Sequence, residues 1–270
     1  ERQVWYLRMT SYRPFIKDVS PAYFGVWLDR LFEGHEMAAR KIGKSAYSVT
    51  GYVSTEKAAK IQRAESSLEQ DFLTLLEYDW RVLRYATQPF KIHWKDGNGR
   101  PRRFTPDIAV AYHSLATEQD PSLRTTIFEV KHRAHLKARW AEEKPRLKAA
   151  FAWAKDYGCR FKVITEQEIR TPYLANARFL LGFKKLYGDQ DLYQARLPHI
   201  CELLVRLGPT TPQALLDEVR GDEVRRAEYI PYLWHLITIR VIGIDLSQPL
   251  NMASPIWPTG HTKWFSENWG

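Results

Sequence analysis

Two acids and a lysine lie in apolar stretches of this sequence that have the composition of β-strands. Asp107 lies in the run Phe104–Ala111, and Glu129 and Lys131 lie in the run Thr125–Lys131. Because side chains alternate between the faces of a strand, Glu129 and Lys131 are expected to point to the same side. A carboxylate in an apolar sheet is costly unless it is paired or binds a metal ion, and hard divalent cations accept such oxygens. Mg²⁺, or Mn²⁺ as its substitute, could then polarise a phosphodiester, with Lys131 orienting the attacking water.

A third acid is predicted on the helix that precedes these runs. The stretch Glu65–Tyr78 has the apolar spacing of a helix, carried by Leu68, Phe72, Leu75 and Leu76. Glu69 falls within the arc of the apolar side chains, so its carboxylate should face inward. Glu65 lies on the same side one turn earlier and could instead cap the helix or support the site. The predicted catalytic set is Glu69, Asp107, Glu129 and Lys131, and its three acids are the predicted metal ligands.

The spacing of these residues is weak evidence for an active site when it is taken by itself. A Glu and a Lys two positions apart are also common on an exposed edge strand, where they do no chemistry. The position of both acids in β-rich apolar runs, rather than in loops, favours the functional interpretation.

Helices and strands in alternation are expected to position these side chains. The expected elements are a helix that begins at Ser20-Pro21, the helix 65–78, strands at 82–94 and 104–112 joined by a turn at 96–99, a polar loop at 117–122, a strand at 125–131, a helix at 138–157 ended by Gly158, and a strand at 161–164. In the first helix the apolar face is Phe24, Trp27, Leu28, Leu31 and Phe32, and in the helix 138–157 the residues spaced for burial are Trp140, Leu147, Ala150, Phe151 and Ala154. This order predicts a mixed α/β core with a central sheet.

The pattern changes after Gly188. Apolar spacing indicates helices at 200–207, at 212–219 and after Gly221, followed by two extended runs around Ser247-Gln248-Pro249. Three short helices and a β-ribbon are typical of a winged helix. Its third helix carries Tyr229, Tyr232 and Trp234 and few basic residues, so both DNA contact near Arg225 and Arg226 and protein docking stay open.

The net charge of +9 indicates a protein that can neutralise phosphates. The candidates for contact with DNA near the site are Gln88, His132, Arg133 and Lys137. Arg40, Lys41 and Lys44 belong to a basic stretch that continues to Thr55 and is expected to be an extended arm or loop.

Two distant cysteines, Cys159 and Cys201, do not have the spacing of a zinc site and suggest a reduced, cytoplasmic protein. No apolar run approaches the ~20 residues that a membrane span requires, and the N-terminus has no signal-peptide pattern. We expect no membrane partner. Because the chain begins at Glu1 without Met, we expect further residues to precede it.

Several linked motifs resemble the TnsA family, the endonuclease subunits of heteromeric Tn-seven-type cut-and-paste transposons. In order along the chain they are Gly43–Gly51, Glu65–Asp79, Tyr85–Phe90, Thr105-Pro-Asp107, Phe128-Glu-Val-Lys131 and Val163–Glu166. The resemblance covers roughly residues 40–185, and the predicted winged helix agrees with the C-terminal domain of that family.

The resemblance implies a restriction-endonuclease-like fold, with Glu69, Asp107, Glu129 and Lys131 as the site. It also implies that the protein cuts the 5′ ends of the element in double-stranded DNA, inside a bacterial cell and on the nucleoid when active. The implied partners are a DDE-type transposase, TnsB, which cuts and joins the 3′ ends, and an AAA+ ATPase, TnsC, which regulates the complex.

The predicted domains are a basic helix and arm at 1–60, an endonuclease domain at 61–187 and a winged-helix domain at 188–270. Two alternatives to the transposon endonuclease remain. One is a repair or restriction nuclease with the same fold, which would cut DNA without a transposase. The other is a non-catalytic adaptor that only binds DNA, through its positive charge and its winged helix.

Overall fold

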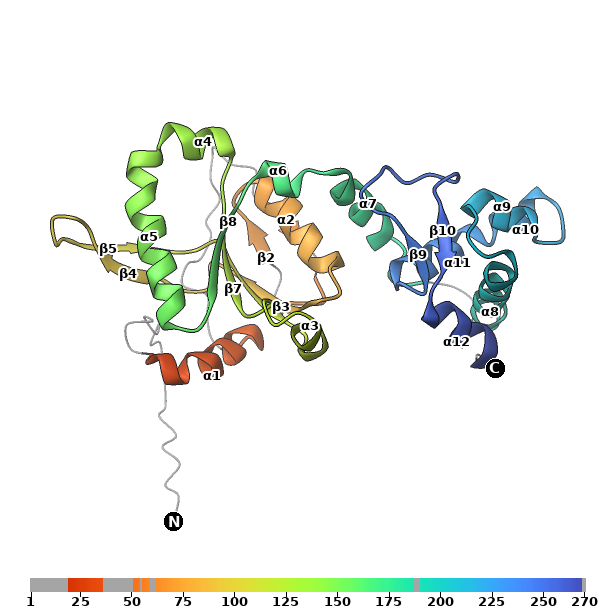
Figure 1. The fold of residues 1–270 in the computed structure, drawn as a ribbon, viewed down its shortest axis with the longest axis horizontal. Helices are drawn as coiled ribbons and strands as arrows, with labels where there is room; N and C mark the ends of the chain where they lie inside the picture. The colour runs from red at the N-terminus through yellow and green to blue at the C-terminus, as the bar shows by residue number, and fades with distance from the viewer. Residues whose placement is uncertain (1–18, 36–50, 54, 59–61, 187–189, 269–270) are drawn as a thin grey trace, which may run out of the picture. The chain divides into compact units, whose positions relative to one another are not determined.

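The computed structural model of this chain describes residues 19–35, 51–53, 55–58, 62–186 and 190–268 (Figure 1). It divides into two compact units, Glu1–Ile169 and Arg170–Gly270. The acids and the lysine singled out above all belong to the first unit.

A four-stranded mixed sheet forms the centre of the first unit. Its strands are β3 (Val82–Thr87), β6 (Ile108–Tyr112), β7 (Thr126–Val130) and β8 (Arg160–Ile164), hydrogen-bonded in that order. Strand β6 runs antiparallel to both β3 and β7, whereas β7 and β8 are parallel. The parallel pair needs a crossover connection, which α4 (Arg133–Ala138) and α5 (Trp140–Asp156) supply. The predicted mixed α/β fold with a central sheet is confirmed.

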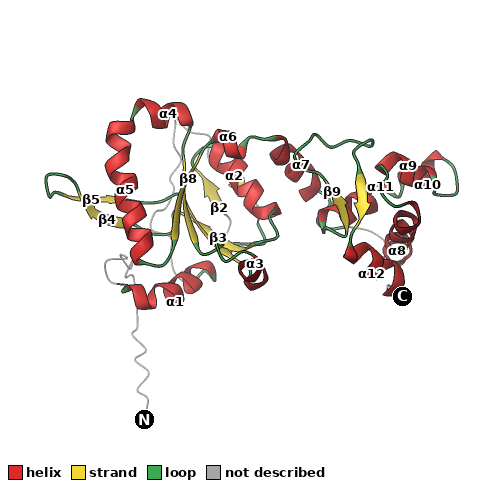
Figure 2. Ribbon diagram, viewed as in Figure 1, coloured by secondary structure: helices red, strands yellow, loops and turns green. Residues whose placement is uncertain are grey.

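Helices cover both faces of this sheet (Figure 2). On one face, α1 (Pro21–Phe32) and α5 pack with Ala109 and Ile127 in one apolar cluster. On the other face, α2 (Ser67–Tyr78) places Phe72 against Phe128, with ring centroids 4.9 Å apart. Ile127 and Phe128, which are neighbours in β7, thus face opposite sides of the sheet and pack against different helices, as the alternation of side chains along a strand requires.

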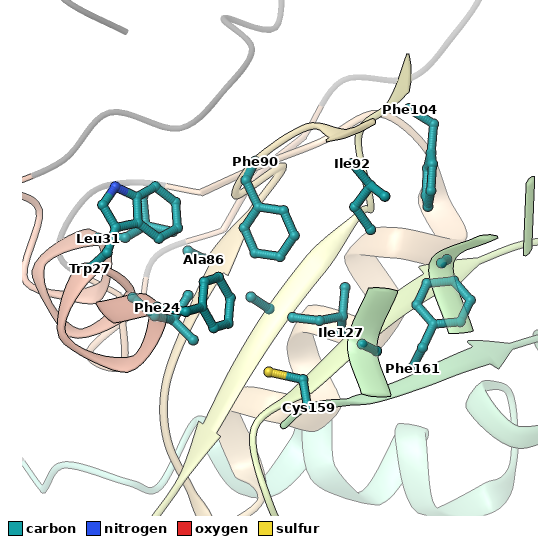
Figure 3. Packing of buried hydrophobic residues seen from close by; sticks show 14 of the residues in the cluster. Phe24, Trp27, Leu31, Ala86, Phe90, Ile92, Phe104, Ile127, Cys159 and Phe161 are labelled. Atoms are coloured by element: carbon teal, nitrogen blue, oxygen red, sulfur yellow. The ribbon is translucent and has the colours of Figure 1, made fainter. Parts of the chain in front are cut away.

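The first helix is held by aromatic contacts (Figure 3). All five residues of its predicted apolar face are buried. Phe24 makes edge contacts with Phe90, Trp153 and Tyr157, at centroid distances of 5.1 to 5.7 Å. Ser20 stands at the N-cap position as predicted, but its side chain makes no capping hydrogen bond.

Both long strands predicted beside the site are interrupted. The first breaks at Gln88-Pro89, between β3 and β4 (Ile92–Lys95), and the second at Thr105-Pro106-Asp107, between β5 (Pro101–Phe104) and β6. Each break contains a proline, which cannot donate to a ladder. Strands β4 and β5 form a separate antiparallel hairpin around the predicted turn, where the Gly99 N–H donates to the Asp96 carbonyl. A short pair of strands, β1 (Gly51–Val53) and β2 (Gln62–Ala64), lies nearer the N-terminus.

Three local predictions are wrong. The polar loop expected at 117–122 overlaps a helix, α3 (Ser114–Gln119), whose Ala116 is buried. Phe151, predicted to be buried, is 60% exposed and makes a T-shaped contact with Phe161, and Trp140 is also exposed. The buried stripe of α5 is Leu147, Ala150 and Ala154, because a surface helix presents one apolar stripe to the core.

The second unit contains helices and a β-ribbon. Its elements are α7 (Pro172–Leu181), α8 (Gln190–Leu207), α9 (Pro212–Asp217), α10 (Glu223–Ala227), α11 (Ile230–Thr238), β9 (Ile242–Ile244), β10 (Ile256–Pro258) and α12 (Gly260–Asn268). The third predicted helix is therefore two helices, α10 and α11. Strands β9 and β10 pair antiparallel, as expected for the two extended runs.

The division between the units lies earlier than the predicted boundary at residue 187. Helix α7 belongs to the second unit, where Phe179 packs against Trp234 with ring centroids 5.1 Å apart. The buried Asn176 amide also donates to the carbonyls of Leu246 and Gln248. These contacts link residues distant in sequence, so helical periodicity alone could not assign α7 to a unit. Of the helices that the structure describes, none is both long enough and apolar enough to cross a membrane.

Candidate active site

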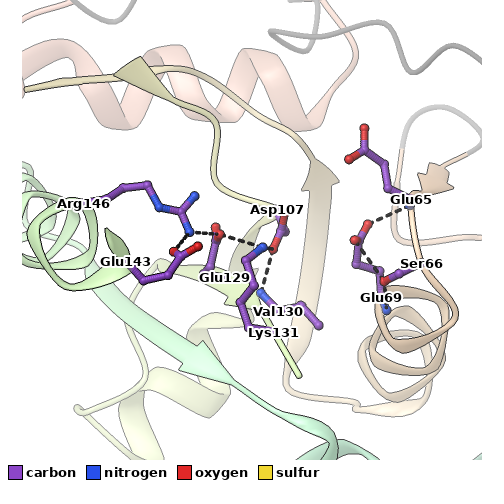
Figure 4. A network of polar contacts seen from close by, with 9 residues as sticks. All are labelled: Glu65, Ser66, Glu69, Asp107, Glu129, Val130, Lys131, Glu143 and Arg146. Carbon is purple, nitrogen blue, oxygen red and sulfur yellow. Dashed lines mark hydrogen bonds and ion pairs between the residues drawn. The ribbon is translucent and has the colours of Figure 1, made fainter. Parts of the chain in front are cut away.

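Asp107, Glu129 and Lys131 meet at one end of the central sheet (Figure 4). Asp107 immediately precedes β6, Glu129 lies in β7, and Lys131 directly follows β7. The Asp107 N–H donates to the Phe128 carbonyl, which holds the start of β6 against β7. The structure therefore brings together three of the four predicted catalytic residues.

Short polar contacts fix this group. The Lys131 Nζ lies 3.0 Å from Glu129 Oε1 and 3.9 Å from Asp107 Oδ2. The Val130 N–H donates to Asp107 Oδ2 at 2.7 Å. The carboxylate of Asp107 is thus oriented by the backbone of the strand that carries the other two residues.

Arg146 of α5 is a member of this group that the sequence analysis missed. Its guanidinium donates to Glu129 Oε1 at 2.9 Å and also to Glu143, and it lies over the Phe104 ring at 5.1 Å from the centroid. A signal was present in the sequence, because Glu143 and Arg146 lie one helical turn before the buried Leu147 and Ala150. Both charged residues thus continue the buried stripe of α5.

The pKa values of Asp107 and Lys131 are both raised above their usual values. Burial, and then the charge of Glu129, raise the pKa of Asp107 well above its usual value, although Lys131 opposes the shift. Burial alone would lower the pKa of Lys131, but the charges of Asp107 and Glu129 outweigh it and raise that pKa. Lys131 is therefore protonated at neutral pH, whereas Asp107 retains its proton to unusually high pH.

An open pocket of about 400 Å³ lies over these residues. Its lining is Glu65, Gln88, Lys91, Arg103, Phe104, Thr105, Asp107, Glu129, Lys131 and Arg146. Glu129 is only 1% exposed, and its Oε2 atom is buried without a hydrogen-bond partner. A buried carboxylate oxygen without a donor is unfavourable, so an additional positive group is expected there.

Glu69 lies apart from this group, and its position at the start of α2 explains why. Its backbone N–H donates to the Ser66 hydroxyl, and its own carboxylate accepts from that hydroxyl and from the Glu65 N–H. This reciprocal arrangement is a variant of the capping box, in which Glu69 accepts from the N–H of the residue before the N-cap Ser66. Figure 4 shows the Glu69 carboxylate turned to these two residues, with no contact to Asp107. Burial raises the pKa of Glu69, and Lys131 acts on it electrostatically in the opposite direction.

No three His, Cys, Asp or Glu side chains in the described part of the chain are grouped as a metal-binding set. The predicted set of three carboxylates is therefore not assembled in this conformation. Asp107 and Glu129 remain the two acids that could share a cation. Mg²⁺ is commonly held by one or two carboxylates together with waters and substrate phosphates. Two carboxylates are therefore enough for a Mg²⁺ site.

The predicted DNA-contact residues differ in exposure. Lys137 of α4 is exposed. His132 and Arg133 are exposed but contact α6 (Glu166–Ile169), where the Arg133 N–H donates to Glu166 at 2.9 Å. Gln88, by contrast, is buried beneath the pocket. Arg40, Lys41 and Lys44 lie outside the described residues.

Two family models match most of this chain. One, described as TnsA-like endonuclease N terminal, matches residues 79–166, and the other, described as TnsA endonuclease C terminal, matches residues 168–246. The first match contains Asp107, Glu129 and Lys131 and ends close to the division between the two units. No curated protein matches the chain.

The two endonuclease matches define this protein as a nuclease. The chain belongs to the TnsA-type transposon endonucleases, and the two matches together identify it as an endonuclease subunit of a transposase.

Proposed function

We propose that this subunit is a metal-dependent endonuclease that cuts the 5′, non-transferred strands at the ends of a transposon. The observation that supports this proposal most strongly is the meeting of Asp107, Glu129 and Lys131 within 4 Å contacts at the end of one sheet. The cut is assigned to the 5′ strands because the chain belongs to the TnsA family.

The chemistry of the two acids fits a divalent cation. Glu129 offers a buried oxygen without a donor, and burial, followed by the charge of the neighbouring Glu129 carboxylate, raises the pKa of Asp107. A cation between them would satisfy the oxygen and remove the repulsion. When bound, Mg²⁺ or Mn²⁺ would polarise the scissile phosphodiester and lower the pKa of the attacking water.

The other residues of the site hold these groups in place. The Val130 N–H fixes one Asp107 oxygen, and Arg146 fixes one Glu129 oxygen, which leaves the second oxygen of Glu129 for a ligand. Lys131 carries a proton on Nζ and can donate a hydrogen bond to the attacking water or to a phosphate oxygen. Its charge would also stabilise the negative charge that develops on the phosphate.

Glu69 is retained as a proposed third acid of the site. Burial raises the pKa of Glu69 and the charge of Lys131 opposes that rise, which supports a position for Glu69 near the site. To bind a cation, the Glu69 carboxylate would have to release its capping bonds to Glu65 and Ser66. We propose that this exchange accompanies binding of metal and DNA.

Double-stranded DNA is the proposed substrate, and basic residues beside the site would bind its backbone. Helix α4 directly follows Lys131 and has no buried residues, and its basic side chains His135 and Lys137 lie in its last turn. Lys137, together with His132 and Arg133 at its start, can reach phosphates near the cut. We include Arg40, Lys41 and Lys44 in this set because the basic arm that carries them resembles that of the family.

The second unit is the proposed docking module of the complex. Its helices and its antiparallel β-ribbon occur in the order of a winged helix, which supports that assignment. Helix α11 is mostly buried and apolar, with Leu233 and Trp234 in the interior, which favours protein docking over the insertion of α11 into a DNA groove. The proposed partners are the DDE-type transposase TnsB and the ATPase TnsC.

Replacement of Lys131 tests the proposal. With the transposase, Mg²⁺ and DNA that carries a transposon end, we expect Lys131→Ala to reduce 5′ strand cutting by at least about 10³-fold. Strand-specific end-labelling and gel analysis measure the cut. Lys148→Ala, which removes an exposed lysine of α5, should cut like the parent protein.

Four outcomes would contradict the proposal. Unchanged cutting by Lys131→Ala, or cutting in the presence of a chelator, would remove the proposed mechanism. Efficient cutting of ordinary duplex DNA by this chain alone would favour a restriction or repair nuclease. DNA binding without cleavage under any condition would favour a non-catalytic adaptor.

A further inference from the structure

Gln88 has a strained backbone beside the site. It directly follows β3, and its φ of 46° lies in the left-handed region that residues other than glycine seldom adopt. Its N–H donates to the Asp107 carbonyl at 2.7 Å. Strained residues of this kind occur often at functional sites, where the surrounding structure holds them.

Gln88 lies at the same end of three adjacent strands as the two acids. Ala86, Ala109 and Ile127 are paired across β3, β6 and β7, and all three face the cluster formed with α1 and α5. One two-residue step along each strand leads to Gln88, Asp107 and Glu129. The Gln88 N–H donates to the Asp107 carbonyl, and the Asp107 N–H donates to the carbonyl of Phe128, the residue before Glu129, so Asp107 lies between the other two.

The two outer residues of these three carry oxygens without donors. Gln88 is 5% exposed and Glu129 is 1% exposed. Gln88 Oε1 and Glu129 Oε2 are the two buried side-chain oxygens, among the residues that the structure describes, that have no hydrogen-bond partner. Both residues line the pocket over Asp107. Two acceptors without donors on either side of a carboxylate call for a shared positive ligand.

We propose that Gln88 Oε1 is a ligand of the divalent cation, on the side of Asp107 opposite to Glu129. This inference rests on the proposed metal dependence and extends it to a residue expected, from the sequence, to contact DNA. Amide oxygens of Gln are among the ligands that hard divalent cations accept. Because Gln88 is buried, we assign contact with the DNA backbone to exposed residues near it instead. Gln88, Asp107 and Glu129 then each supply an oxygen to the cation, while the Glu69 carboxylate still makes its capping hydrogen bonds.

Mn²⁺ binding to the full chain without DNA tests this assignment. In calorimetric or paramagnetic-resonance titration, we expect Gln88→Gly and Gln88→Leu to weaken Mn²⁺ binding by at least about tenfold. Gln88→Glu should keep or tighten binding, because it replaces a neutral oxygen by a charged one. Gln119→Leu, at an exposed position of α3, should bind like the parent chain.

The glycine variant separates a metal ligand from a purely structural residue. Glycine adopts a positive φ without strain, so Gln88→Gly should keep or raise the Tm of the metal-free protein while it loses Mn²⁺ affinity. Unchanged affinity in Gln88→Gly, or a fall in its metal-free Tm together with the affinity, would overturn the assignment of Gln88. Absence of Mn²⁺ binding by the parent chain would instead contradict the proposed function itself.

Discussion

Asp107→Asn is expected to abolish strand cutting and at the same time to raise the Tm of the metal-free protein. The activity should fall by at least about 10³-fold, because the amide cannot supply a charged ligand. Burial and the neighbouring Glu129 raise the pKa of Asp107, so the native state holds its proton more tightly than the unfolded chain does. The ionised carboxylate therefore destabilises the folded protein at neutral pH. Each kcal/mol regained should raise Tm by about 2–4 °C.

The effect of Asp107→Asn on stability should depend on pH. Stability that comes from protonation of Asp107 is present below the usual Asp pKa of about 3.9 and is lost as the pH rises toward the raised native value. The neutral Asn does not titrate. The gain in Tm should therefore be small near pH 4 and larger at pH 7.

Thermal unfolding of metal-free protein at the two pH values measures this change. Asp156→Asn, at an exposed position near the end of α5, is the matched control and should alter neither Tm nor cutting. A lower Tm for Asp107→Asn at pH 7 would show that Asp107 stabilises the fold, contrary to this account.

Arg146→Met is expected to cause a large loss of stability. The guanidinium contacts both Glu129 and Glu143, whose side chains are 1% and 13% exposed. Removal of one partner from a buried ion pair costs about 3–5 kcal/mol because a charge is left without compensation. The side chain of Arg146 is itself 22% exposed, so we expect a loss near the lower end of that range.

Chemical denaturation of the full chain measures the effect of Arg146→Met on the free energy of unfolding of the first unit. The matched control is Arg139→Met, which breaks the exposed ion pair with Glu142 in the same unit, where the side chains are 54% and 66% exposed. Such a surface pair contributes about 0–1 kcal/mol. Equal losses for the two variants would mean that the Arg146 contact with Glu129 is not a buried structural pair.

Local sequence patterns predicted the elements that carry the site. The period of two in β7 put Glu129 and Lys131 on one face, and the Asp-Gly-Asn-Gly turn marked the β4–β5 hairpin. The apolar face of α1 was also predicted in full. These features depend on residues close together in the chain, which periodicity and turn chemistry describe well.

Features that depend on tertiary contacts could not be predicted in the same way. Arg146 joins the site because α5 crosses back over the sheet, and Gln88 leaves its strand because the chain turns to pair β4 with β5. Glu69 is half-buried on α2, and its capping role depends on the backbone at Glu65 and the hydroxyl of Ser66, which helical spacing does not describe. Its part in catalysis stays a prediction.

Anomalous diffraction from crystals of this chain soaked in Mn²⁺ is the most direct test of the central claim. We predict a Mn²⁺ peak in the pocket within bonding distance of both the Asp107 and Glu129 carboxylates, and no such peak in crystals of Asp107→Asn. A well-ordered site with no anomalous density between these two acids would contradict the claim that they share a metal ion.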